Sequence, residues 1–151
     1  MSVAPPSAGA IVVLDTNIVL DLWVFADPVT DPLRAALESG GLRWHGTAVM
    51  RDELARVLDY PHLAARLRRP ARGADAVLAA FDRWVQPVAP APKAPWTCKD
   101  PDDQKFIDLA VHLQATLLSK DRAVLCMARR LSRAGVGVAR CWVPAPHTGG
   151  A

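Results

Sequence analysis

Long hydrophobic runs are absent from the sequence, and its first residues lack the basic, apolar character of a signal peptide. We therefore expect no membrane span and a location in the cytoplasm. Cysteine is scarce, and Cys98, Cys126 and Cys141 form neither a C-x-x-C pair nor a cluster with histidine at the spacing of a zinc site. We expect them to be reduced and mostly buried thiols. These absences argue against a membrane protein, a disulfide scaffold and a zinc module.

A strong charge of one sign is also missing, since 18 Lys and Arg residues stand against 15 Asp and Glu residues, for a formal net charge of +3. That excess is too small to indicate nucleic-acid binding by itself. The arginines are grouped, however, in the middle of the chain and near its end: Arg66, Arg68, Arg69, Arg72 and Arg83, then Arg129, Arg130, Arg133 and Arg140. Each group is either a solvated helix face or a basic surface that holds phosphates beside an acidic pocket, and the sequence leaves both interpretations open.

Short apolar runs alternate along the 151 residues with longer segments of helical periodicity. Strands are predicted at 11–15, 42–45, 86–88, 116–119 and 136–143, and helices at 17–25, 31–39, 48–59, 62–69, 73–84, 101–114 and 123–132. This alternation predicts an α/β fold with a mainly parallel sheet. We expect one domain at 11–143 between two loose tails, 1–10 and 144–151.

Two of the predicted strands end in an acid. Asp15 follows Ile-Val-Val-Leu, and Asp121 follows Leu-Leu-Ser-Lys. The carboxyl ends of parallel strands share one edge of the sheet, where α/β proteins bind ligands. Glu53 and Asp103 lie near the starts of two predicted helices, and those helix ends face the same edge. Four carboxylates from distant segments are therefore expected to meet there.

Carboxylates held close together repel one another, so such a group favours a bound cation. Oxygen ligands alone favour Mg²⁺ or Mn²⁺, and such an ion suits the hydrolysis of a phosphodiester. Each acid also has a simpler interpretation. Asp15 and Asp121 can each cap a helix, Glu53 can be a solvated helix residue, and the acids of the segment 100–103 can all serve a helix N-terminus.

Four segments of the chain resemble, together and in this order, the motifs of the PIN-domain ribonucleases. The resemblance is to the bacterial branch of toxin–antitoxin toxins related to VapC-type toxins, and its segments are Val-Leu-Asp-Thr-Asn (13–17), Asp-Glu-Leu-Ala-Arg-Val-Leu-Asp-Tyr-Pro (52–61), Asp-Pro-Asp-Asp-Gln-Lys-Phe-Ile-Asp-Leu-Ala (100–110) and Ser-Lys-Asp (119–121). It implies a three-layer α/β/α sandwich and a Mg²⁺- or Mn²⁺-dependent endoribonuclease, the toxin of a type II toxin–antitoxin pair. It also implies an RNA substrate, a homodimer and a small antitoxin protein as partner.

Residue by residue, the resemblance assigns catalysis and metal binding to Asp15, Glu53, Asp103 and Asp121. Helical periodicity does not separate Asp102 from Asp103, and Gln104 stands where related proteins often carry another acid. Asp100 and Asp102 are therefore alternatives for the third acid. Asn17 and Ser119 are expected to support the metal ligands, and Thr16 is expected to be structural. Lys120 or Arg122 is expected to contact the RNA backbone.

Two rival functions stay open. One is a non-catalytic PIN-like module that binds RNA or a protein without cutting. The other is a phosphohydrolase or receiver-type domain with Asp15 as nucleophile. A haloacid-dehalogenase-type hydrolase would carry a second aspartate at position 17, where Asn17 stands. A dinucleotide-binding domain is disfavoured, because no G-x-G-x-x-G follows the first strand.

Overall fold

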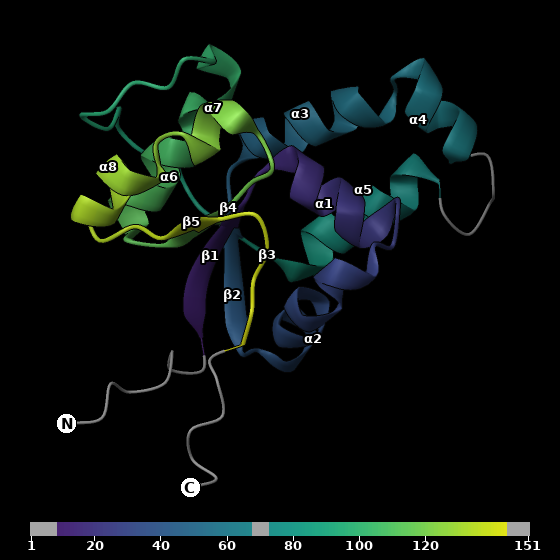
Figure 1. The fold of residues 1–151 in the computed structure, drawn as a ribbon. Helices are drawn as coiled ribbons and strands as arrows, with labels where there is room; N and C mark the ends of the chain where they lie inside the picture. The colour runs from purple at the N-terminus through teal and green to yellow at the C-terminus, as the bar shows by residue number, and fades with distance from the viewer. Residues whose placement is uncertain (1–8, 68–72, 145–151) are drawn as a thin grey trace, which may run out of the picture.

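The computed structural model describes residues 9–67 and 73–144 (Figure 1). Within these ranges it contains one five-stranded sheet in the order β3-β2-β1-β4-β5, and every neighbouring pair is parallel. The strands are β1 (Ala10–Leu14), β2 (Leu42–Gly46), β3 (Val85–Pro87), β4 (Thr116–Leu118) and β5 (Val138–Ala139). Helices cover both faces, so the predicted α/β/α sandwich is confirmed.

Eight α-helices and two short 3-10 helices are present in the described ranges. The α-helices are α1 (Thr16–Trp23), α2 (Asp31–Ser39), α3 (Ala48–Leu58), α4 (Pro61–Arg66), α5 (Ala74–Trp84), α6 (Gln104–Leu113), α7 (Arg122–Leu125) and α8 (Ala128–Arg133), and the 3-10 helices are η1 (Pro28–Thr30) and η3 (Pro101–Asp103). None of them has the length and apolar character that crossing a bilayer requires. Figure 1 shows α1, α2 and α5 on one side of the sheet and α6, α7 and α8 on the other.

The central strand β1 is buried on both faces, as its continuous apolar run predicts. Val12 and Leu14 pack into the core beneath α1, α2 and α5, and Val13 packs into the core beneath α6 and α8. Val12 and Val13 are fully inaccessible to solvent. A strand held so firmly fixes the position of the residue that follows it, which is Asp15.

Three aromatic rings pack together in the core beneath α1, α2 and α5. Trp44 on β2 stacks on Trp23 of α1 at 5.6 Å between ring centroids, and it meets Phe81 of α5 edge to face at 4.9 Å. Such pairs add about 0.5–1.5 kcal/mol beyond the area that they bury. These contacts join β2 to helices on either side of it in the chain.

Helix starts follow the sequence signals in part. The Thr47 side chain accepts a hydrogen bond from the backbone N–H of Met50 and caps α3, as its hydroxyl predicts. The turn Asp-Thr-Asn before the helix expected at 17–25 also predicts a cap at Thr16 or Asn17, and this prediction is wrong. Asp15 holds the capping position without a side-chain capping bond, and its Oδ2 accepts a hydrogen bond from Ser119. The helix α2 ends at Gly40, whose φ of 82° is left-handed, as a glycine after a helix predicts.

The end of the chain departs from the predicted elements. The strand predicted at 136–143 is only Val138–Ala139, which pairs with Leu117 and Leu118 at the end of β4. Beyond it, Trp142 packs against the core of α1 and α2. The helix predicted at 123–132 is broken into α7 and α8 around Cys126.

Two predictions of burial are wrong. Cys126 and Cys141 are exposed, so only Cys98 is a buried thiol. The apolar positions of the helix expected at 48–59 place Val49 on its buried face, but Val49 is exposed on α3. The expected basic group in the middle of the chain falls partly outside the described residues, which omit Arg68, Arg69 and Arg72. The assignment of one domain to 11–143 stays a prediction.

Gly46 at the end of β2 leaves room for its neighbour strand. A Cβ at this position would lie 2.9 Å from Cγ2 of Val85, so Gly46→Ala is expected to lower the free energy of unfolding by about 1–3 kcal/mol. Gly137→Ala is the matched control, since its Cβ would meet nothing nearer than Thr116 Oγ1 at 3.9 Å. Urea unfolding compares the two. Equal stability of both variants with wild type would contradict the tight packing of β2 on β3.

Candidate metal centre

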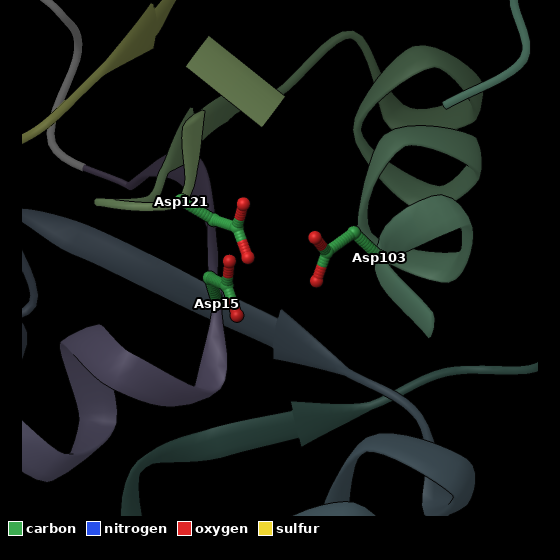
Figure 2. A group of neighbouring side chains, drawn as sticks. All are labelled: Asp15, Asp103 and Asp121. Carbon is green, nitrogen blue, oxygen red and sulfur yellow. The ribbon is translucent and has the colours of Figure 1, made fainter. Parts of the chain in front are cut away.

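Three aspartates meet at the carboxyl edge of the sheet. Asp15 follows β1, Asp121 follows β4, and Asp103 ends η3 just before α6. Figure 2 shows their side chains pointing toward one another, and one carboxylate oxygen from each lies within 4.8 Å of the other two. The structure therefore brings together three of the four acids that the sequence predicts at this edge.

Asp15 is held from the neighbouring strand. Its Oδ2 accepts a hydrogen bond of 2.6 Å from Ser119 Oγ, which in turn accepts one of 3.0 Å from the backbone N–H of Asp121. Asp15 is 3% exposed and Ser119 is fully buried. Burial raises the pKa of Asp15, aided by the charges of Glu53 and Asp121, while the Ser119 hydrogen bond opposes the shift. Ser119 thus connects two members of the cluster and favours the ionised form of one of them.

Asp121 caps a helix and also belongs to the group of three acids. Its Oδ1 accepts a hydrogen bond of 2.9 Å from the backbone N–H of Ala123 and caps α7. The capping interpretation and the metal interpretation of this residue are therefore compatible, since the same carboxylate also belongs to the cluster.

Asp103 is the most perturbed acid of the three. It is 7% exposed, and its Oδ2 is buried without a hydrogen-bond partner. Burial raises the pKa of Asp103 to about 8, and the nearby Asp15 and Asp121 add to the shift. A buried oxygen without a donor, facing two other carboxylates, is unfavourable in the ionised state. A hard divalent cation would remove that cost, and the all-oxygen donor set suits Mg²⁺ or Mn²⁺. The residues present therefore fit such an ion.

Glu53 lies on the same pocket but outside the group of three. The pocket has a volume of about 330 Å³ and is lined by Asp15, Thr16, Asn17, Leu20, Glu53, Val57, Asp103 and Asp121. Thr16 Oγ1 donates a 2.6 Å hydrogen bond to Glu53 Oε2, and Lys105 Nζ donates one of 2.9 Å to Glu53 Oε1. Asn17 also lines this pocket.

The sequence did not point to Thr16 and Lys105 as site residues. Lys105 carried an available signal, because a cation in the first turn of a helix opposes the helix dipole and therefore suggests a specific acidic partner. Thr16 carried none, since a threonine at the start of a helix is common for reasons of capping alone.

The alternatives for the third acid lie elsewhere. Asp100 accepts a hydrogen bond from the backbone N–H of Asp102 and caps η3, and the Asp102 side chain is exposed. Gln104 accepts a hydrogen bond from the backbone N–H of Cys98 and donates to the carbonyl of Trp96 and to Asp108 Oδ1. Of the segment 100–103, only Asp103 enters the cluster.

Lys120 and Arg122, the two residues expected to contact RNA, lie in different surroundings. Lys120 Nζ lies 2.6 Å from Oδ2 of the buried Asp21 and lines a separate pocket. Arg122 lines a wide hollow of about 600 Å³ together with two other exposed cations, Lys99 and Arg140. The charge of Lys120 is thus already paired, and that of Arg122 faces a basic surface.

The fold and the site together define an α/β protein with an acidic, metal-type centre at the carboxyl edge of a parallel sheet. The family model for the PIN domain matches residues 11–123, so the chain belongs to the PIN-domain family. PIN domains are generally nucleases, and the matched range includes all four predicted acids. A comparison with curated proteins found no significant match.

Removing the Ser119 hydroxyl tests the connection between Asp15 and Asp121. Ser119→Ala removes the acceptor of the Asp121 backbone N–H and the side-chain donor of the Asp15 carboxylate, which is expected to cost about 1–3 kcal/mol of stability. It is also expected to weaken the binding of Mn²⁺ about 10- to 100-fold, the usual effect of losing a group that orients a ligand. Calorimetric titration measures the affinity, and unchanged binding would show that Ser119 does not orient the acid.

Proposed function

We propose that this protein is a metal-dependent endoribonuclease that hydrolyses RNA phosphodiester bonds at the centre formed by Asp15, Asp103 and Asp121. The observation that carries the proposal is the meeting of three carboxylates from distant segments within 4.8 Å, in a chain of the PIN-domain family. The ion is Mg²⁺ or Mn²⁺, since the donors are all oxygen.

The three aspartates hold the ion, and the surrounding residues hold the aspartates. A divalent ion supplies Lewis acidity that stabilises charge on a phosphoryl oxygen and makes water a better nucleophile at neutral pH. Ser119 fixes the Asp15 carboxylate, and the start of α7 fixes Asp121. Burial and the neighbouring acids raise the pKa of Asp103, so a divalent ion held by the three aspartates would favour its ionised form.

The basic hollow beside the acids supports RNA as the substrate. Lys99 comes directly before the segment of Asp100–Asp103, and Arg122 directly follows Asp121. No described acid forms an ion pair with Lys99, Arg122 or Arg140. We propose that these three cations hold phosphates of the RNA next to the bond to be cut. In this proposal Arg122 keeps the role expected of it, and Lys120 does not contact RNA.

The biological setting is proposed from the resemblance of the four sequence segments. In this proposal the protein is the toxin of a type II toxin–antitoxin pair in the cytoplasm, acts as a homodimer and is silenced by a small antitoxin protein. Expression of the chain with and without the gene next to it tests this setting. Growth arrest that the neighbouring gene relieves would support it, and normal growth of cells that contain active enzyme would contradict it.

Incubation of the purified protein with single-stranded and structured RNAs tests the activity. Cleavage is expected with Mg²⁺ or Mn²⁺ and is expected to stop in EDTA. Cleavage that persists in EDTA would contradict the metal mechanism. RNA binding without any cleavage, in both metals and across all substrates, would favour the non-catalytic module.

A further inference from the structure

Lys105 supplies a fixed positive charge to one half of the acidic pocket. Its Nζ lies 2.9 Å from Glu53 Oε1, and the two side chains are 22% and 16% exposed. The same ammonium also donates a hydrogen bond to the carbonyl of Asp102. With Thr16 bonded to Oε2, both oxygens of the Glu53 carboxylate have a donor from the protein. The negative charge of Glu53 is therefore balanced by Lys105, and both of its oxygens are held by side chains of the protein.

The other half of the pocket has no such charge. Among residues 9–67 and 73–144, no Lys, Arg or His forms an ion pair with Asp15, Asp103 or Asp121. One oxygen of Asp103 lacks even a hydrogen-bond donor. The four acids thus divide into three that face one another without a cation and one that already has a cation.

We propose that the Lys105 ammonium takes the place of a second metal ion, so that the pocket binds one divalent ion at the three aspartates and Glu53 is not a ligand. The proposal rests on the proposed function, because it assumes that the aspartates bind a divalent ion. A second ion at Glu53 would have to displace the ammonium from a partly buried ion pair, where charges are screened less than in water. Lys105 is a positioning residue in this account: it keeps Glu53 on the pocket wall and ties the start of α6 to α3.

The number of Mn²⁺ ions bound per chain tests the proposal without reference to activity. Electron paramagnetic resonance of free Mn²⁺ during titration is expected to give one ion per chain for wild type. Glu53→Gln is expected to bind that ion with an affinity within about threefold of wild type, because the substitution removes no ligand of the ion. Lys105→Met removes the charge and keeps the length of the side chain, and it is expected to reveal a second, weaker ion. The double variant with Glu53→Gln is expected to lose that second ion again.

Lys99→Met is the matched control, because Lys99 is an exposed lysine without an acidic partner among the described residues, and it is expected to keep one ion. Two ions in wild type, with one lost in Glu53→Gln, would overturn the proposal. A single ion in folded Lys105→Met would also overturn it. If Lys105→Met fails to fold, wild type and Glu53→Gln decide the question alone. Absence of any Mn²⁺ binding in wild type would instead refute the proposed metal centre and with it the proposed function.

Discussion

Asp103→Asn is expected to stabilise the metal-free protein at neutral and higher pH, although it removes an acid from the centre. The folded protein raises the pKa of this carboxyl from 3.8 to about 8. Between those two values the folded state keeps a proton that the unfolded state has lost, so the wild type loses stability as pH rises through this window. Asparagine has no proton to lose. The variant should therefore be more stable in EDTA by about 1–3 kcal/mol at pH 8, and the difference should shrink toward pH 4.

The same substitution is expected to abolish the stabilisation that Mn²⁺ gives to the wild type. Urea unfolding at pH 5, 7 and 8.5, with and without Mn²⁺, measures both effects. Asp102→Asn is the matched control, because this neighbouring aspartate is exposed and lies outside the cluster. A variant that is less stable than wild type in EDTA at pH 8, or that still gains stability from Mn²⁺, would contradict the assignment of Asp103.

Replacing either of the other two aspartates is expected to have the largest effect on activity. Asp15→Asn and Asp121→Asn each keep the shape of the side chain and remove one negative charge from the group that holds the ion. Initial rates of RNA cleavage in Mg²⁺ are expected to fall about 10³-fold or more, which corresponds to about 4 kcal/mol of lost transition-state stabilisation.

The control for this loss is an acid near the pocket that does not belong to it. Asp52 is exposed on α3 beside Glu53, and Asp52→Asn is expected to cleave at close to the wild-type rate. Circular dichroism checks that all three variants are folded. Cleavage by folded Asp15→Asn at the rate of wild type would remove this residue from the reaction.

Much of this site follows from the sequence because the fold rule behind it is simple. A buried parallel strand ends at a defined edge, so the acids that follow β1 and β4 are placed by the pattern of apolar residues before them. Asp15 and Asp121 are predictable for that reason. Ser119 is predictable in the same way, since it follows β4 directly and faces the neighbouring acid.

The choice between Asp102 and Asp103 is not predictable from helical periodicity. The segment begins as the 3-10 helix η3, whose turn differs from that of an α-helix, and Asp103 points inward while Asp102 stays exposed. The ion-pair partners of two lysines are likewise not predictable from the sequence. Lys105 and Lys120 both lie two residues or fewer from a predicted site acid, yet each pairs with another acid, Glu53 and Asp21. Such pairs depend on how helices pack across the sheet, which local sequence does not encode.

Diffraction from a crystal soaked in Mn²⁺ tests the central claim most directly, because the anomalous signal locates the ion without reference to any assumed mechanism. The account predicts one peak in contact with carboxylate oxygens of Asp15, Asp103 and Asp121, and no peak at Glu53 while Lys105 is present. No peak at the three aspartates in a crystal saturated with Mn²⁺, or a peak bound by other residues alone, would contradict the account.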